Sequence, residues 1–316
     1  MKSHAISLVD STLREGHQAP GVHFNDVDSV AIAQQLYDTG INCIEVGHPY
    51  ASEQEFNRVA AVRNALPSAD ILAHARARVE DVDAVAKTRS SWIGIFAGVN
   101  EYSQKYRLQK SLEEILKLVE ISVRHAKSLG LCVRYTVEDA SRTPSLDLFR
   151  AYSVALEAGA DRLCFADSVG LHDPDSAKVA IGAVRERFPD VPLEVHFHDD
   201  RGLALANALA AVSVGATHVS CSVNGIGERS GITDTCAMIA NLSFLNLASS
   251  IKPENIMTLS HTVSAITDAW PDAWRPVVGS NSFTHKSKLH VTASSRNEHC
   301  YHWMEPQLLG RQAVLL

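Results

Sequence analysis

Eight short runs of β-branched and other apolar residues recur along the chain, with stretches of helical apolar spacing between them. The first such stretch begins near Asp26, carries Val30 and Leu36 on one face, and stops before Gly40. We therefore predict eight strands alternating with helices. The eight runs cover residues 5–10, 41–47, 69–75, 92–98, 131–139, 162–168, 193–199 and 217–223.

Eight strands alternating with helices over roughly 240 residues are typical of an α/β (β/α)8 TIM barrel, whose active site lies at the carboxyl ends of its strands. An open, doubly wound sheet is the alternative architecture. It is disfavoured because the first run is followed by STLREG and not by a G-x-G-x-x-G turn. We predict a catalytic barrel over residues 1–250. Residues 251–316 are predicted to form a short helical and irregular C-terminal extension.

Composition limits the possible partners. The 316 residues are 46% hydrophobic and 21% charged, which suits a globular protein with a large core. With 29 basic and 36 acidic residues the net charge is −7, and no basic cluster favours nucleic acid. The opening MKSHAISLVD contains no signal-like apolar run, and no stretch of about 18 apolar residues is present to span a membrane. We expect a cytoplasmic protein.

The six cysteines form no C-x-x-C pair, and four of them lie inside the apolar runs or similar stretches. Reduced thiols that pack in the core explain this distribution better than a cysteine nucleophile or a thiolate metal site. The six are Cys43, Cys132, Cys164, Cys221, Cys236 and Cys300.

The clearest chemical signal is the run Glu194-Val-His-Phe-His198 in the seventh predicted strand. Alternate residues of a strand share a face, so His196 and His198 are expected to point together into the barrel. Two imidazoles on one face can chelate a divalent metal, and Glu15 after the first strand can add a carboxylate ligand. Two hydrogen-bonded core histidines are the plainer alternative. Glu194 has the same parity but lies deeper, where an ion pair is expected.

In the fifth predicted strand Arg134, Thr136 and Glu138 alternate onto the inner face. An arginine inside an apolar barrel needs an anion. A distal carboxylate of the substrate would accept hydrogen bonds from both terminal nitrogens of this arginine. This reasoning predicts a diacid substrate. An ion pair between Arg134 and an internal acid is the alternative.

Four motifs at these positions, DSTLREGHQ, HFHDDRGLALANALAAVSVGATHV, NGIGERSGIT and FTHKSKLHV, resemble the acyl-CoA condensing branch of the DRE-TIM metallolyase superfamily. The order and spacing are similar over nearly the whole chain. Within this branch, Glu15 and the Gly-Ile-Thr at 231–233 resemble homocitrate synthases more than isopropylmalate synthases. The resemblance implies a divalent cation (Zn²⁺, Mn²⁺ or Mg²⁺) bound by Glu15, His196 and His198, and acetyl-CoA as co-substrate.

The resemblance also implies roles at the substrate. Arg14 and Gln18 would support the reacting end of the 2-oxo acid, and Ser168 would hold its first carboxylate. The far carboxylate would be surrounded by His74, Arg134 and Thr136. The expected reaction is a Claisen-type condensation of acetyl-CoA with a 2-oxo diacid, 2-oxoglutarate first. The alternatives are another oxo acid (oxaloacetate, phosphonopyruvate or 2-oxoisovalerate), retro-aldol cleavage by the same site, and a barrel that only binds a partner.

Proton transfer is assigned by the same resemblance to Glu138, His290 and Tyr301, together with Arg14 at the keto oxygen. Because His290 belongs to the extension, the resemblance implies a homodimer in which this segment reaches the barrel of the partner. Three departures from the family pattern are KSKLHVTASSR, HDD where HND is common, and an end soon after LLGRQAVLL. They lead us to expect no separate regulatory domain and a specialised paralogue with a different oxo acid.

Overall fold

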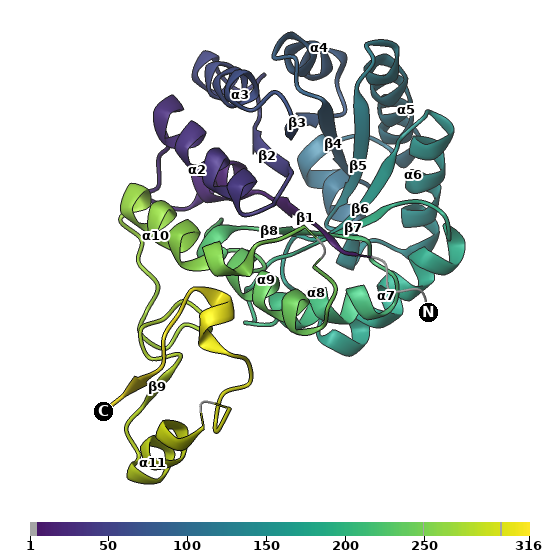
Figure 1. The fold of residues 1–316 in the computed structure, drawn as a ribbon. Helices are drawn as coiled ribbons and strands as arrows, with labels where there is room; N and C mark the ends of the chain where they lie inside the picture. Colours follow the sequence, from purple (N-terminus) through teal and green to yellow (C-terminus); the bar gives the residue numbers. More distant parts are fainter. Residues whose placement is uncertain (1–4, 249, 298) are drawn as a thin grey trace.

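The computed structural model of the protein describes residues 5–248, 250–297 and 299–316. Eight parallel strands close into a barrel in chain order, with β8 paired to β1, and helices surround it (Figure 1). The predicted TIM barrel is therefore confirmed. The strands are β1 (Ser7–Asp10), β2 (Cys43–Gly47), β3 (Asp70–Arg76), β4 (Trp92–Gly98), β5 (Cys132–Glu138), β6 (Arg162–Asp167), β7 (Leu193–Phe197) and β8 (His218–Cys221).

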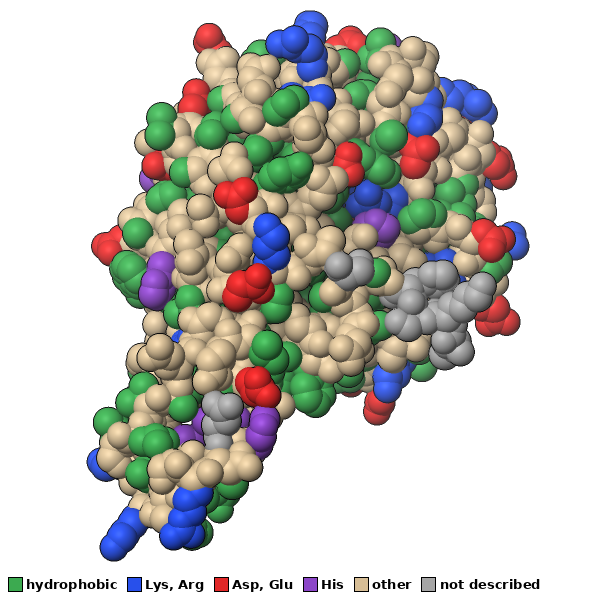
Figure 2. Space-filling model, viewed as in Figure 1, with side chains coloured by type: hydrophobic (Ala, Val, Ile, Leu, Met, Phe, Trp, Pro, Cys, Tyr) green, Lys and Arg blue, Asp and Glu red, His purple; other side chains and the backbone are tan. Residues whose placement is uncertain are grey.

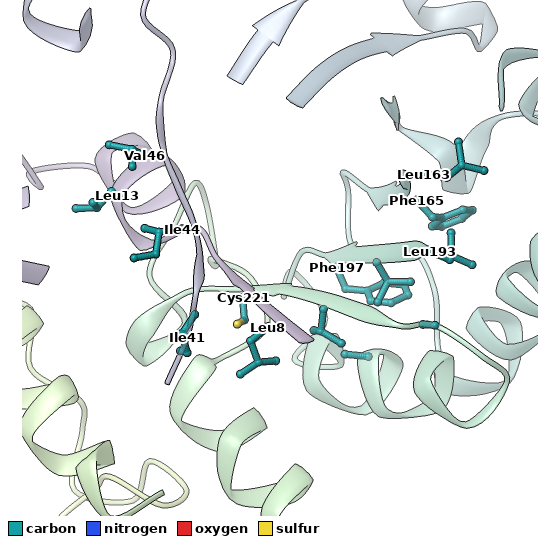
Figure 3. Packing of buried hydrophobic residues seen from close by; sticks show 14 of the residues in the cluster. Leu8, Leu13, Ile41, Ile44, Val46, Leu163, Phe165, Leu193, Phe197 and Cys221 are labelled. Carbon is teal, nitrogen blue, oxygen red and sulfur yellow. The ribbon is translucent and has the colours of Figure 1, made fainter. Parts of the chain in front are cut away.

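The two faces of each strand have different surroundings. In β7, Val195 and Phe197 belong to the main hydrophobic core, whereas the alternating Glu194 and His196 do not. Figure 3 shows Phe197 with Phe165 of β6 among the side chains of this apolar layer. The alternation expected from the sequence thus sends apolar residues toward the helices and leaves polar residues for the barrel interior.

Five of the eight helices of the outer layer begin at side-chain caps that the sequence provides. Asn25 and Asp28 form a capping box at the first long helix, and Ser111 and Glu114 form another. The helices of the outer layer are α2 (Asp26–Asp38), α3 (Glu53–Ala65), α4 (Val79–Lys87), α5 (Leu112–Ser128), α6 (Ser145–Glu157), α7 (Pro174–Arg187), α8 (Ala204–Ser213) and α9 (Thr235–Phe244). In the described part of the chain no helix is long and apolar enough to cross a membrane.

All six cysteines are free, and four of them are buried. Burial raises the pKa of Cys43 to about 11, and it also raises the pKa values of the buried thiols Cys164, Cys221 and Cys236. These groups therefore stay protonated, as expected for thiols that serve packing.

The segment after residue 250 has two parts. Helix α10 (Ile256–Thr267) lies beside α2 (Figure 1), and its Ile256, Leu259 and Val263 are fully buried. The chain leaves the barrel only after this helix and forms an arm that contains β9 (Thr284–His285), α11 (Lys288–Arg296) and β10 (Val314–Leu315). The predicted extension thus contains a barrel-packed helix and a projecting arm, and Val277, Val278, Phe283 and Leu309 between or beside these parts also join the main core. Figure 2 shows hydrophobic, histidine and basic side chains exposed together on that arm.

Candidate active site

A cavity of about 610 Å³ opens at the carboxyl ends of the strands. It lies where a TIM barrel places its catalytic groups. Ten of the predicted site residues line it, contributed by the ends of β1, β3, β5, β6 and β7. They are Arg14, Glu15, Gln18, His74, Arg134, Thr136, Glu138, Ser168, His196 and His198.

Glu15, His196 and His198 form the group within the described residues that is suited to a metal ion, with ligand atoms all within 4.8 Å of one another. The Nε2 atoms of the two imidazoles are 3.3 Å apart, and Oε1 of Glu15 is 3.7 Å from Nε2 of His196. Glu15 lies in the short helix α1 (Thr12–Glu15), directly after β1. The closed barrel therefore joins residues that are far apart in sequence.

The protonation states of this triad suit metal binding. Burial lowers the pKa of His196 to about 3, so its ring is neutral at physiological pH. Burial opposes ionisation of Glu15, but Arg14 and the two histidines outweigh it and hold the pKa of Glu15 below its usual value. Ser220 contacts Nδ1 of His196 at 2.9 Å, an interaction that fixes the orientation of the ring.

Two buried atoms of the triad, Oε2 of Glu15 and Nδ1 of His198, have no hydrogen-bond partner among the described residues. Buried polar atoms are normally paired, so unpartnered ones in a cavity indicate a missing ligand or water. Two neutral imidazoles and one carboxylate with open positions form a donor set suited to Zn²⁺ or another divalent transition metal. The residues present therefore fit the cation that the sequence predicted.

Arg134 is 2% exposed, and both of its terminal nitrogens are engaged by internal acids. One donates to Glu45 at 2.6 Å and the other to Glu194 at 2.8 Å. The alternative raised from the sequence, an ion pair between Arg134 and internal acids, is therefore confirmed, and a contact between Arg134 and a substrate carboxylate stays a prediction. The predicted ion pair of Glu194 is confirmed.

Glu45 is a site residue that the sequence reading missed. It is fully buried, and it accepts hydrogen bonds from Ser11 at 2.5 Å, from two nitrogens of Arg14 and from Arg134. Burial opposes its ionisation, but Arg134 and Arg14 hold its pKa well below the usual range. An acid between Ile44 and Val46 in an apolar strand was the available signal, since its parity points it into the barrel.

The ion pairs form one chain through the barrel, in which acids and arginines alternate. The three acids balance the three arginines, so this chain contributes no net charge to the cavity. A substrate dianion must therefore obtain its counter-charge from elsewhere, which gives the cation site electrostatic importance. The members in order are Glu15, Arg14, Glu45, Arg134, Glu194 and Arg162.

His74 lines the cavity between this ion-pair chain and Phe96, on which its ring stacks at 4.3 Å. Burial, opposed by the contact with Glu45, lowers the pKa of His74 to about 4. The neutral ring donates from Nδ1 to the ionised Glu45 at 3.1 Å, so its Nε2 can only accept. Contact between this nitrogen and a substrate carboxylate therefore requires the imidazole to take up a proton.

The hydroxyl groups on the cavity wall are free to donate. Oγ1 of Thr136 is buried and has no partner among the described residues. Oγ of Ser168 accepts from the backbone N–H of Asp139 at 2.9 Å, which leaves its own proton available. Gln18 is exposed at the rim.

His290 and Tyr301 are on the arm, with their rings stacked at a centroid distance of 3.9 Å. Neither residue lines the cavity, whereas Glu138 does. The fold of one chain thus brings together ten of the twelve predicted residues and leaves the two arm residues elsewhere.

Comparisons with known proteins agree with this fold. The sequence profile of the HMGL-like family matches residues 5–263. The chain belongs to the HMGL-like family. It is similar to the homocitrate synthase of Pyrococcus abyssi, with 36% identity over 308 residues that cover 98% of this chain and 85% of the relative. The homocitrate synthase of Saccharolobus solfataricus is 34% identical over 310 residues, which cover 97% and 67% of the two chains.

Among solved structures, the HMG-CoA lyase of Bacillus subtilis matches with a TM-score of 0.76 at 21% sequence identity. The match covers 84% of the present chain and 95% of the lyase. At this identity the likeness concerns the fold. The near full-length similarity to homocitrate synthases confirms the resemblance found in the motifs.

Proposed function

We propose that this protein is a metal-dependent condensing enzyme that joins the acetyl group of acetyl-CoA to a 2-oxo diacid, with 2-oxoglutarate as the first candidate. The observation that carries the proposal is the cluster of Glu15, His196 and His198 in a cavity that also contains the carboxylate of Glu138. The homocitrate synthases to which the chain is similar supply the reaction class.

Glu15, His196 and His198 would hold the cation, which when bound supplies Lewis-acid polarisation of a keto group. Arg14 is positioned by Glu45 and Glu15 at the same end of the cavity. Its guanidinium would stabilise the negative charge that develops on the keto oxygen during condensation. Ser168 and Gln18 would bind the adjoining carboxylate through their free donors.

The distal group of the oxo acid would lie near His74, Thr136 and Arg134. Thr136 offers an unpartnered hydroxyl, and His74 would become a donor after protonation. Arg134 would contribute mainly through its field, because Glu45 and Glu194 already engage it. Three other oxo acids would test how strictly this end requires a carboxylate: oxaloacetate, which is a shorter diacid, phosphonopyruvate, which carries a phosphonate there, and 2-oxoisovalerate, which has only one carboxylate.

The base that removes a proton from the acetyl methyl would be assembled from Glu138 and the His290–Tyr301 pair. Since His290 does not line the cavity of its own chain, we place it in the cavity of a second copy, which makes the active enzyme a homodimer. The arm exposes Leu289, Tyr301 and Trp303, and burial of such a surface against a partner is favourable.

The test is a thiol-release assay with the purified protein, acetyl-CoA, added Zn²⁺, Mn²⁺ or Mg²⁺, and a panel of 2-oxo acids. Condensation leaves the product as a CoA thioester, and its hydrolysis by water releases the thiol. Release of CoA that depends on both the cation and a 2-oxo diacid is the expected result. If no oxo acid releases CoA and the protein instead splits a hydroxyacyl-CoA or a 4-hydroxy-2-oxo acid, the retro-aldol function replaces the proposed one.

A further inference from the structure

We propose that Arg107, a residue without an assigned role, is a positioning residue that fixes the carboxylate of Glu138 so that one oxygen faces the reacting groups. This inference rests on the role of Glu138 in the proposed function. It is carried by three observations: the unusual segment that holds Arg107, the attachment of that segment to the barrel, and the environments of the two carboxylate oxygens.

Arg107 lies in a π-helix, Ser103–Leu108, shortly after β4. The following Gln109 has a left-handed backbone with φ of 52°. π-Helical turns are rare and are often found at functional sites. The segment starts close to the residue it serves, because Gly98 at the end of β4 is the register partner of Glu138 at the end of β5.

The π-helix is fixed to both strands. A Cβ atom at Gly98 would collide with Oγ of Ser103, so glycine allows the segment to pack directly on the strand end. Asn100 accepts from the backbone N–H of Ser103 at 2.9 Å and donates to Asp139, the neighbour of Glu138, at 2.6 Å. The position of Arg107 relative to Glu138 is therefore set by contacts to both strand ends.

The two oxygens of Glu138 have different surroundings. Oε1 forms an ion pair with Arg107. Oε2 is buried and has no hydrogen-bond partner among the described residues, although Glu138 lines the cavity. A carboxylate held at one oxygen by a guanidinium loses rotational freedom, and its other oxygen is presented to accept a hydrogen bond or a proton. An imidazole N–H entering the cavity would find this acceptor already oriented.

A purely structural role is less consistent with the exposure of the pair. The Arg107 side chain is 40% exposed, and ion pairs at this level of exposure add little to folding stability. A nearby pair, Arg142 with Asp139, provides a matched control because the Arg142 side chain is 38% exposed and neither residue lines the cavity. Arg142 also lies over the ring of Tyr102 beside the π-helix, so its removal controls for loosening of this segment.

The experiment compares R107Q, R107K, R142Q, E138Q and the double variant R107Q/E138Q in the CoA-release assay with the cation present. R107Q should lower kcat by about 10- to 100-fold and leave KM for the oxo acid and bound metal unchanged. R107K should recover most of the turnover, and R142Q should behave like the wild type. In the E138Q background R107Q should have no further effect, because Arg107 acts through Glu138.

The inference would be overturned if turnover of R107Q stayed within twofold of the wild type. It would also be overturned if R107Q lowered the turnover of E138Q by the same factor as it lowers that of the wild type. A wild type that releases no CoA with any oxo acid would instead contradict the proposed function, and the same variants would then be compared in the retro-aldol assay. A crystal structure of R107Q separates the two questions further. Glu138 should turn away from its present orientation, and an unmoved carboxylate would count against a positioning role.

Discussion

The barrel mouth and the C-terminal arm carry the predicted site residues in opposite environments. At the mouth, polar groups are buried and joined by an ion-pair chain that balances its own charges. On the arm, Leu289 and Tyr301 are exposed, and His290 stacks on Tyr301 away from the cavity. Strand topology alone places a residue at the mouth. A residue on the arm reaches a catalytic position only if the arm contacts the barrel of a second copy of the chain.

The largest effect expected at the mouth is loss of the cation. H196A or H198A should reduce bound metal from about one ion per chain to nearly none and abolish turnover, because each removes one of three protein ligands. Metal analysis after dialysis of the purified variants measures this. A variant such as S220A, which changes only the neighbour of His196, should keep part of the metal. Full metal content in H196A and H198A would show that the triad is not the binding site.

His290 tests the opposite region. H290A should lower kcat by about a hundredfold or more, while metal content and oxo-acid affinity remain near those of the wild type. If the arm serves the partner's cavity, mixing H290A with H196A subunits should restore activity, since hybrid dimers contain one intact site. Mass spectrometry of the mixture verifies that hybrids form. Verified hybrids without activity would mean that the arm does not act across subunits.

Arg134 distinguishes a structural ion pair from a substrate contact. R134M would leave Glu45 and Glu194 with fewer partners inside the barrel, and loss of one member of a buried pair typically costs about 3–5 kcal/mol. Urea unfolding measures this loss. A second assay compares 2-oxoglutarate with 2-oxobutyrate. Equal losses for both acids would assign Arg134 to structure, and a selective loss for the diacid would restore the contact predicted from the sequence.

The smallest expected effect concerns acid stability of the barrel. Burial lowers the pKa of His218 from the ordinary 6.5 to about 4. Between these values the unfolded chain binds a proton that the folded chain excludes, so stability falls as the pH falls through this window. H218N should remove this contribution, which amounts to at most about 1.4 kcal/mol per pH unit. Unfolding curves from pH 7 to pH 4.5 check it, and an unchanged slope would contradict the assignment.

The pKa values of His74 and His196 are also lowered, to about 4 and about 3, so both residues likewise lower the stability as the pH falls. The H218N variant should therefore keep part of its sensitivity to acid. Asp10 has the opposite sign. Burial raises its pKa to about 6, so its contribution to stability decreases as the pH rises through the range between its usual value and about 6. Toward acid pH the three histidines together lower the stability of the fold, and Asp10 partly offsets this loss. The fall in stability is therefore steeper than His218 alone would produce only if the histidines outweigh Asp10.

The sequence by itself determined the order of strands and helices and the face on which each strand carries polar residues. His196 and His198 were found because a strand repeats every two residues, and this periodicity is local. Glu15 was found because the carboxyl ends of all barrel strands meet at one mouth. The motifs then identified the family, which the comparisons confirmed.

Only the tertiary structure decided which charges satisfy each other. Arg134 and Glu45 are 89 positions apart, and no local pattern could show that they meet at 2.6 Å. The same holds for Arg107 and Glu138, which are joined because a π-helix packs on the end of β4 beside β5. Local periodicity gives the direction in which a side chain points. The partner that the side chain meets depends on the closure and packing of the whole barrel, which for Arg134 selected internal acids, the second of the two partners that the sequence left open.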